Sequence, residues 1–289
     1  MVSIPSGQVR QPELSSFGEC IASWMPWRKS ILMAFESYFD GSNVGGWDTG
    51  RTVTLAGFAA EDSIWLEVDK EWRRILSDTS KRPPAEYLHM REATHLEKEF
   101  SFAKGWTIPK VNSLVMDLLM YLQHVDKERF RMFWCTVDLD AHRKLKDEGL
   151  GIAEPIEICI DCPTVALDWF FIKWPGIISS AHYFFDIGEP FKAPFEDRWR
   201  SKKAFSLDGS DHFWSLLKTV ATVQMRDKPG LQAADLIAWA VNRKFSAQKD
   251  AAFSGVESIM QNVIPSSSIL WDEQKLRERR GRIHDKIQP

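Results

Sequence analysis

The order of the apolar segments along the chain is the feature that most restricts its fold. Residues 31–40 form an apolar, aromatic run that predicts a buried strand, and residues 52–60 predict a second strand that pairs with it as a hairpin across a glycine-rich turn. Beyond the hairpin, segments of helical periodicity alternate with short apolar runs. The pattern predicts helices at 62–77, 108–125, 163–174, 213–217 and 231–245, and strands at 86–90, 130–137, 180–185 and 219–225. This order predicts an α/β fold with a mixed β-sheet.

The same pattern divides the 289 residues into three parts. Residues 1–30 form an irregular N-terminal arm, residues 31–250 hold the α/β domain, and residues 251–289 form a C-terminal extension that ends in a charged helix. No run reaches the roughly eighteen apolar residues of a transmembrane helix, so no membrane partner is expected. The N-terminus lacks the layout of a secretory signal, and four cysteines do not suggest a disulfide framework. The expected location is therefore the cytoplasm.

Charge and aromatic content leave the class of partner open. The net charge is −3, whereas nucleic-acid-binding proteins usually carry a basic balance or a basic face. Local patches decide binding, so the net charge does not exclude nucleic acid. Thirteen tryptophans are an unusually high number. The simpler interpretation is that they pack in the core. The alternative is that two or more of them form a stacking platform for nucleic-acid bases.

Acidic residues stand at the ends of predicted strands and at the start of a predicted helix. Asp40 ends the first strand, Asp186 follows the strand at 180–185, and Asp235 lies on the first turn of the helix at 231–245. A carboxylate just beyond the carboxyl end of a strand faces the crevice where open α/β sheets bind ligands. Carboxylate ligands without a His or Cys cluster suit Mg²⁺ or Mn²⁺. Two such ions about 4 Å apart support phosphodiester hydrolysis.

Each of these acids also has a structural interpretation. Asp40 is otherwise a turn residue that accepts a local backbone hydrogen bond, and Asp235 an acid favoured by the helix dipole. Asp138 ends another predicted strand, and either it or Glu189 is an alternative to Asp186.

Three polar residues near these acids are candidates for substrate contact. Gln232 lies three residues before Asp235 and shares its helix face, and Ser42 follows Asp40 in the turn. His89 follows a short apolar run. Gln232 would either touch substrate or orient a ligand. The structural alternatives are turn capping for Ser42 and a hydrogen-bonded structural histidine at position 89.

The two end segments resemble a known family. The run Leu231-Gln232-Ala233-Ala234-Asp235-Leu236-Ile237-Ala238 resembles the last motif of the domain of unknown function 3800 family, and Asp40-Gly41-Ser42-Asn43 resembles its first motif, usually Asp-Glu-Ser-Gly. Leu88-His89-Met90 and Phe184-Phe185-Asp186-Ile187-Gly188 resemble its middle segments. The similarity spans residues 31–246. Gly41 departs from the family pattern, because it stands where the usual glutamate follows the first aspartate.

The resemblance implies a ribonuclease H-like mixed sheet flanked by helices, with helical insertions, over residues 31–250. It implies a metal-dependent nuclease that acts on DNA or RNA, with Asp40, Asp186 and Asp235 as catalytic residues and as ligands of Mg²⁺ or Mn²⁺. The alternative, which the loss of the glutamate at Gly41 keeps open, is a catalytically inactive ribonuclease H-like scaffold that binds nucleic acid or a partner protein.

Overall fold

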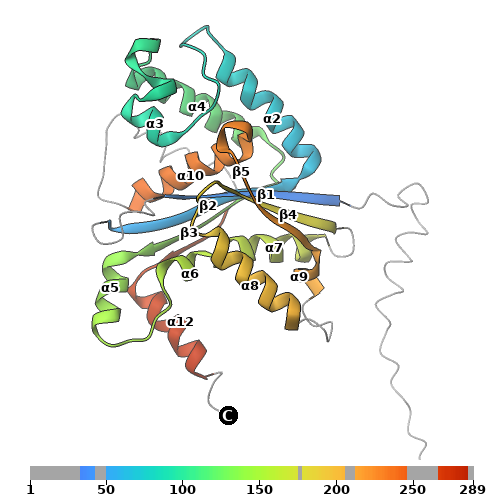
Figure 1. Cartoon of the computed structure of the whole chain (residues 1–289), viewed down its shortest axis with the longest axis vertical. Helices are drawn as coiled ribbons and strands as arrows, with labels where there is room; N and C mark the ends of the chain where they lie inside the picture. Colours follow the sequence, from blue (N-terminus) through green and yellow to red (C-terminus); the bar gives the residue numbers. More distant parts are fainter. Residues whose placement is uncertain (1–32, 43–49, 175–177, 206–211, 246–265, 286–289) are drawn as a thin grey trace, which may run out of the picture.

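A mixed six-stranded sheet forms the centre of the computed structural model, which describes residues 33–42, 50–174, 178–205, 212–245 and 266–285 (Figure 1). The strands are β1 (Met33–Ser42), β2 (Thr52–Glu61), β3 (Phe130–Asp138), β4 (Ile178–Asp186), β5 (Leu217–Val223) and β6 (Ser266–Trp271). Their order is β5–β4–β1–β2–β3–β6. The β1–β2 and β2–β3 pairs are antiparallel, and the β4–β1, β5–β4 and β3–β6 pairs are parallel. The α/β fold with a mixed sheet is therefore confirmed, and it is consistent with a ribonuclease H-like fold.

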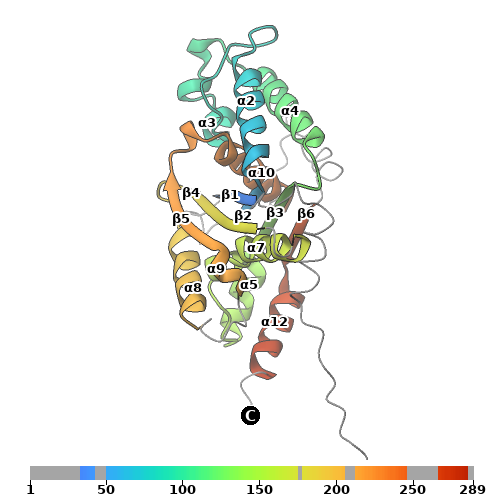
Figure 2. The same ribbon diagram turned by 90° about the vertical axis from the view of Figure 1, so that its right-hand side faces the viewer.

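Helices cover both faces of the sheet (Figures 1 and 2). One face carries α2 (Asp62–Ser77), α3 (Met90–His95), α4 (Ile108–His124) and α10 (Pro229–Phe245). The other face carries α5 (Leu139–Asp147), α6 (Pro155–Cys159), α7 (Asp161–Lys173), α8 (Lys192–Phe205), α9 (His212–Leu216) and α12 (Glu273–Asp285). Short 3₁₀ turns lie at η2 (Lys98–Phe100), η3 (Phe102–Lys104) and η5 (Met225–Asp227). No helix of the described residues combines the length and apolar character needed to cross a membrane.

The alternation of side chains along β1 divides the interior into two cores. Phe35 and Phe39 point to the core beneath the sheet, which also holds Tyr183 and Phe185 of β4. Tyr38 points to the opposite core, where it contacts Trp65 of α2 at 4.7 Å between ring centroids. Asp40 lies two residues beyond Tyr38, so it faces the same side as α10.

The predicted helices at 62–77, 108–125, 163–174, 213–217 and 231–245 are present as α2, α4, α7, α9 and α10. The predicted strand at 86–90 is wrong, because no strand forms there and α3 begins at Met90. Its backbone donors bond to side chains instead of a neighbouring strand. The charged C-terminal helix is present as α12, but β6 was not predicted and joins the C-terminal segment to the sheet. The expected arm at 1–30 lies outside the described residues.

Candidate active site

Two adjacent parallel strands and one helix bring the three predicted acids to one end of the sheet. Phe39 of β1 pairs with Phe185 of β4, so Asp40 and Asp186 are the next residues along neighbouring parallel strands. Helix α10 packs across β1 and β2 and carries Asp235. Asp40 and Asp235 are only 6% and 8% exposed. The two carboxyl groups are close enough for the charge of Asp235 to raise the pKa of Asp40. The fold therefore joins acids that are far apart in the sequence.

Glu189 is a fourth carboxylate in the same cluster. It follows the turn that ends β4, in which Gly188 has a positive φ of 85°, a conformation that glycine adopts readily. Its Oε2 accepts a hydrogen bond of 3.1 Å from the backbone N–H of Gly41. The charge of Glu189 also raises the pKa of Asp40. Glu189 thus joins the site together with Asp186 instead of replacing it.

Burial and mutual repulsion shape the electrostatics of these carboxylates. Burial, followed by the charges of Asp235, Glu189 and Asp186, holds the pKa of Asp40 well above its usual value. Burial likewise raises the pKa of Glu189. Burial raises the pKa of Asp235 to about 6, although His89 and the N–H of Met90 oppose the shift. The neutral form of Asp40 is therefore favoured over the charged form.

Within the described part of the chain, none of the four carboxylates forms a salt bridge with lysine or arginine. Most buried charges in proteins are paired or coordinate a metal. Asp40 is buried among like charges, and its raised pKa means that the neutral form offsets the cost of burial.

Backbone N–H groups hold two of the carboxylates from opposite sides. The N–H of Met90 donates to Asp235 Oδ2 at 2.6 Å, and the N–H of Met225 donates to Asp186 Oδ1 at 2.9 Å. Sequence reasoning missed both donors. The apolar content of 86–90 resembled a strand, although that segment supplies its N–H groups to α10.

Gln232 lies buried behind the carboxylates. Gln232 is 1% exposed, and its side-chain oxygen accepts hydrogen bonds from Trp72 Nε1 and Leu88 N. Its burial leaves both predicted roles, contact with substrate and orientation of a ligand, as predictions.

His89 and Ser42 lie near the cluster. His89 is the residue before α3, its side chain is 33% exposed, and its Nδ1 lies 3.2 Å from Glu92 Oε1. Its influence on the pKa of Asp235 places it beside the cluster. Ser42 ends β1, on the same side of the strand as Asp40. No contact of either residue tests the predicted binding of substrate.

Asp138 does not join the cluster. It accepts hydrogen bonds from the N–H groups of Asp140 and Ala141, so it caps the start of α5. Strand β2 separates its strand from β1.

The chemistry of the donor set fits a hard divalent cation, because all four groups are carboxylates. As they are placed, however, no three His, Cys, Asp or Glu side chains among the described residues form a group that could hold a metal ion. Burial and the neighbouring carboxylates favour the protonated form of Asp40. A bound cation would therefore have to displace this proton.

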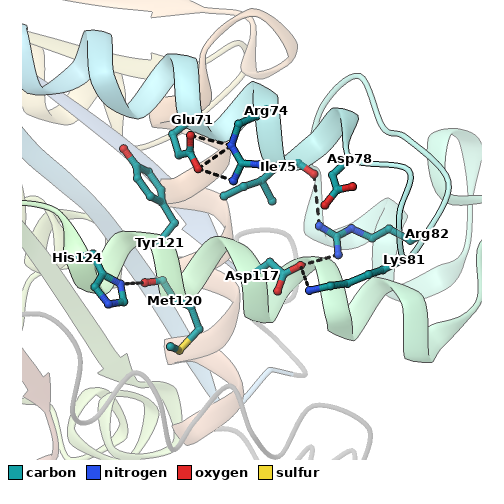
Figure 3. Close-up of a pocket in the computed structure, with 10 residues that line it drawn as sticks. All are labelled: Glu71, Arg74, Ile75, Asp78, Lys81, Arg82, Asp117, Met120, Tyr121 and His124. Carbon is teal, nitrogen blue, oxygen red and sulfur yellow. Dashed lines mark hydrogen bonds and ion pairs between the residues drawn. The ribbon is translucent and has the colours of Figure 1, made fainter.

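A separate cavity of about 350 Å³ lies between α2 and α4 (Figure 3). Most of its charged groups pair with one another: Arg74 with Glu71, and both Lys81 and Arg82 with Asp117. None of the predicted site residues lines it. We therefore place the candidate chemistry at the carboxylate cluster and not in this cavity.

Comparison with known proteins adds no family assignment, since neither a protein-family model nor a curated protein matches the sequence.

Proposed function

We propose that the protein is a metal-dependent nuclease that hydrolyses phosphodiester bonds of DNA or RNA. In this proposal Asp40, Asp186 and Asp235 hold one or two Mg²⁺ or Mn²⁺ ions, and Glu189 is a further carboxylate ligand. The observation that carries the proposal is the convergence of these carboxylates, of which Asp40 and Asp235 are more than nine-tenths buried, with no salt-bridged lysine or arginine among the residues that the structure describes. The resemblance of the segments around Asp40 and Asp235 to the domain of unknown function 3800 family also supports it.

The residues of the chain would contribute position and charge. Divalent ions, when bound, lower the pKa of an attacking water and neutralise charge on the phosphate. Asp40 and Asp186 would present oxygens from rigid neighbouring strands, and Asp235 from a buried helix, so little side-chain entropy would remain to be lost on binding. In this proposal a nucleic-acid strand would approach past His89, whose side chain is 33% exposed, and past the turn after Asp186, where Ile187 and Gly188 are exposed.

Calorimetric titration with Mn²⁺ tests the metal site directly. We expect wild-type protein to bind Mn²⁺. Asp40→Asn and Asp235→Asn should each weaken binding by more than the roughly 10- to 100-fold that loss of an outer-shell partner costs. Asp138→Asn is the matched control, because asparagine also caps helices and Asp138 lies outside the cluster. Wild-type protein that binds no Mn²⁺ would refute the metal site.

Cleavage assays then separate an enzyme from the inactive scaffold. The absence of a preformed metal-ligand group among the described side chains is the observation that favours the scaffold. We expect wild-type protein with Mn²⁺ to cleave single- or double-stranded DNA or RNA, and Asp186→Asn to reduce the rate by at least ~100-fold. Nucleic-acid binding without cleavage on any of these substrates would support the scaffold.

A further inference from the structure

Gln232 forms more of the described hydrogen bonds than any of the four carboxylates of the cluster. Its Oε1 accepts hydrogen bonds from Leu88 N and Trp72 Nε1, both at 2.9 Å. Its Nε2 donates to the carbonyl oxygens of Met225 at 3.1 Å and Arg226 at 3.3 Å. The two acceptor positions and two donor positions of the amide are therefore all used.

The two segments that Gln232 binds are the segments that hold the carboxylates. Leu88 lies two residues before Met90, whose N–H donates to Asp235. Met225 accepts from Gln232 through its carbonyl and donates to Asp186 through its N–H. One side chain thus joins the backbone donor of Asp235 to the backbone donor of Asp186.

Only an amide of this length provides both functions at this position. The segment around Leu88 offers a donor and needs an acceptor, while the turn at Met225 offers carbonyl oxygens and needs donors. A glutamate at this position keeps the acceptor but loses at least one of the two donor bonds. A methionine keeps the approximate length but provides neither the amide acceptor nor the amide donors. The residue type is therefore matched to both segments at once.

We infer that Gln232 is a positioning residue that fixes the separation of Asp186 and Asp235 and so sets the affinity of the site for divalent cations. This inference rests on the proposed function for its metal, but not for the geometry that it assigns to Gln232. Because the residue is buried behind the carboxylates, it would act through Leu88 and Met225 and would not touch substrate.

Residue-resolved amide hydrogen exchange and Mn²⁺ titration of the full chain test the two parts separately. In Gln232→Met we expect exchange at the Met90 and Met225 amides to rise about tenfold relative to amides of α4, because each carboxylate loses its anchored donor. Mn²⁺ affinity should fall roughly 10- to 100-fold, as for other outer-shell partners. Trp72→Phe is the matched control: it removes one hydrogen bond to the same oxygen but leaves Leu88 and Met225 bound to Gln232.

Gln232→Glu is the second variant, which keeps the inference testable if Gln232→Met does not fold. It retains the acceptor for Leu88 N, so exchange should rise at Met225 and not at Met90. Equal exchange at both amides in the folded variants and wild type would overturn the positioning role. Raised exchange with wild-type Mn²⁺ affinity would overturn its effect on the metal. If wild-type protein binds no Mn²⁺ while exchange rises as expected, the proposed function fails and the positioning of the carboxylates stands.

Discussion

At the scale of single residues, the protein keeps acids where ionisation is unfavourable. Asp235 is buried and its pKa is raised from 3.8 to about 6. The folded state therefore binds a proton more tightly at this carboxyl than the unfolded state does. The stability contributed by the protonated form is fully present below the unfolded pKa and is lost as the pH rises through the folded pKa. The ionised form of Asp235 thus lowers the stability of the metal-free protein at neutral pH. Groups with pKa values shifted in this way are concentrated at functional sites in proteins.

Asp235→Asn should therefore stabilise the metal-free protein in a pH-dependent way. At pH 8 with a chelator present, we expect the free energy of unfolding to rise by on the order of 3 kcal/mol, since one pKa unit corresponds to about 1.4 kcal/mol. The gain should shrink as the pH falls from about 6 and disappear below about 3.8. Denaturant unfolding at several pH values measures it, with Asp138→Asn as the control. A gain that does not change with pH would show that Asp235 is not the titrating group.

At the scale of elements, helix α10 reaches β1 because its second residue, Gly230, has no side chain. A Cβ atom at Gly230 would lie 2.4 Å from the nearest atom of the Tyr38 ring, which is itself packed against Trp65 and Phe184. The close approach seats α10 on the strand that carries Asp40, and Asp235 follows five residues later along the same helix. The spacing between these two acids therefore depends on the contact between Gly230 and Tyr38.

Gly230→Ala should weaken both the fold and the metal site. Alanine favours helices by about 1 kcal/mol over glycine, but a crowded core contact costs typically 1–3 kcal/mol, so we expect a net loss of stability. Mn²⁺ affinity should fall as well, because α10 must shift away from β1. Gly151→Ala is the control, since a Cβ there meets no atom within 4 Å. Thermal unfolding and Mn²⁺ titration measure both effects. A variant with a shifted unfolding temperature but unchanged Mn²⁺ affinity would contradict the link between this contact and the site.

The elements also show which parts of the site the sequence could predict. Local sequence patterns were sufficient to predict α2, α4 and α10 and the strands that carry Asp40 and Asp186. The spacing of their apolar residues matches the side of each element that is buried. The segment at 86–90 was misread, since a run whose backbone N–H groups donate to the side chains of Gln232 and Asp235 has the same composition as a strand. The turn at Gly188 brings Glu189 to the backbone of Gly41. This contact joins residues far apart in the sequence, so local patterns could not predict it. Strand β6 contains three serines and lacks the apolar alternation that would have identified it.

At the scale of the whole molecule, the sheet lies between the carboxylate cluster and the lower hydrophobic core. The carboxylate cluster lies on the face covered by α10, whereas the core beneath the sheet is closed by the C-terminal elements (Figure 1). Trp271 of β6 and Leu276 of α12 are 6% and 1% exposed in that lower core. Since β6 pairs in parallel with β3, the C-terminal segment completes the sheet as well as the core.

This separation predicts that stability and Mn²⁺ affinity can be changed independently. Leu276→Ala should lower the free energy of unfolding by roughly 2–5 kcal/mol, as for other buried leucines. It should leave Mn²⁺ affinity within about twofold of wild type, because Leu276 packs on the opposite side of the sheet from Asp235 and sites that share no partners act additively. Glu278→Ala, an exposed change on the same helix, controls for the surface of α12. Denaturant unfolding and Mn²⁺ titration of the folded variants test the prediction. A fall in Mn²⁺ affinity that parallels the loss of stability would mean that the lower core also holds the carboxylates in place, and the sheet would then transmit strain between its faces.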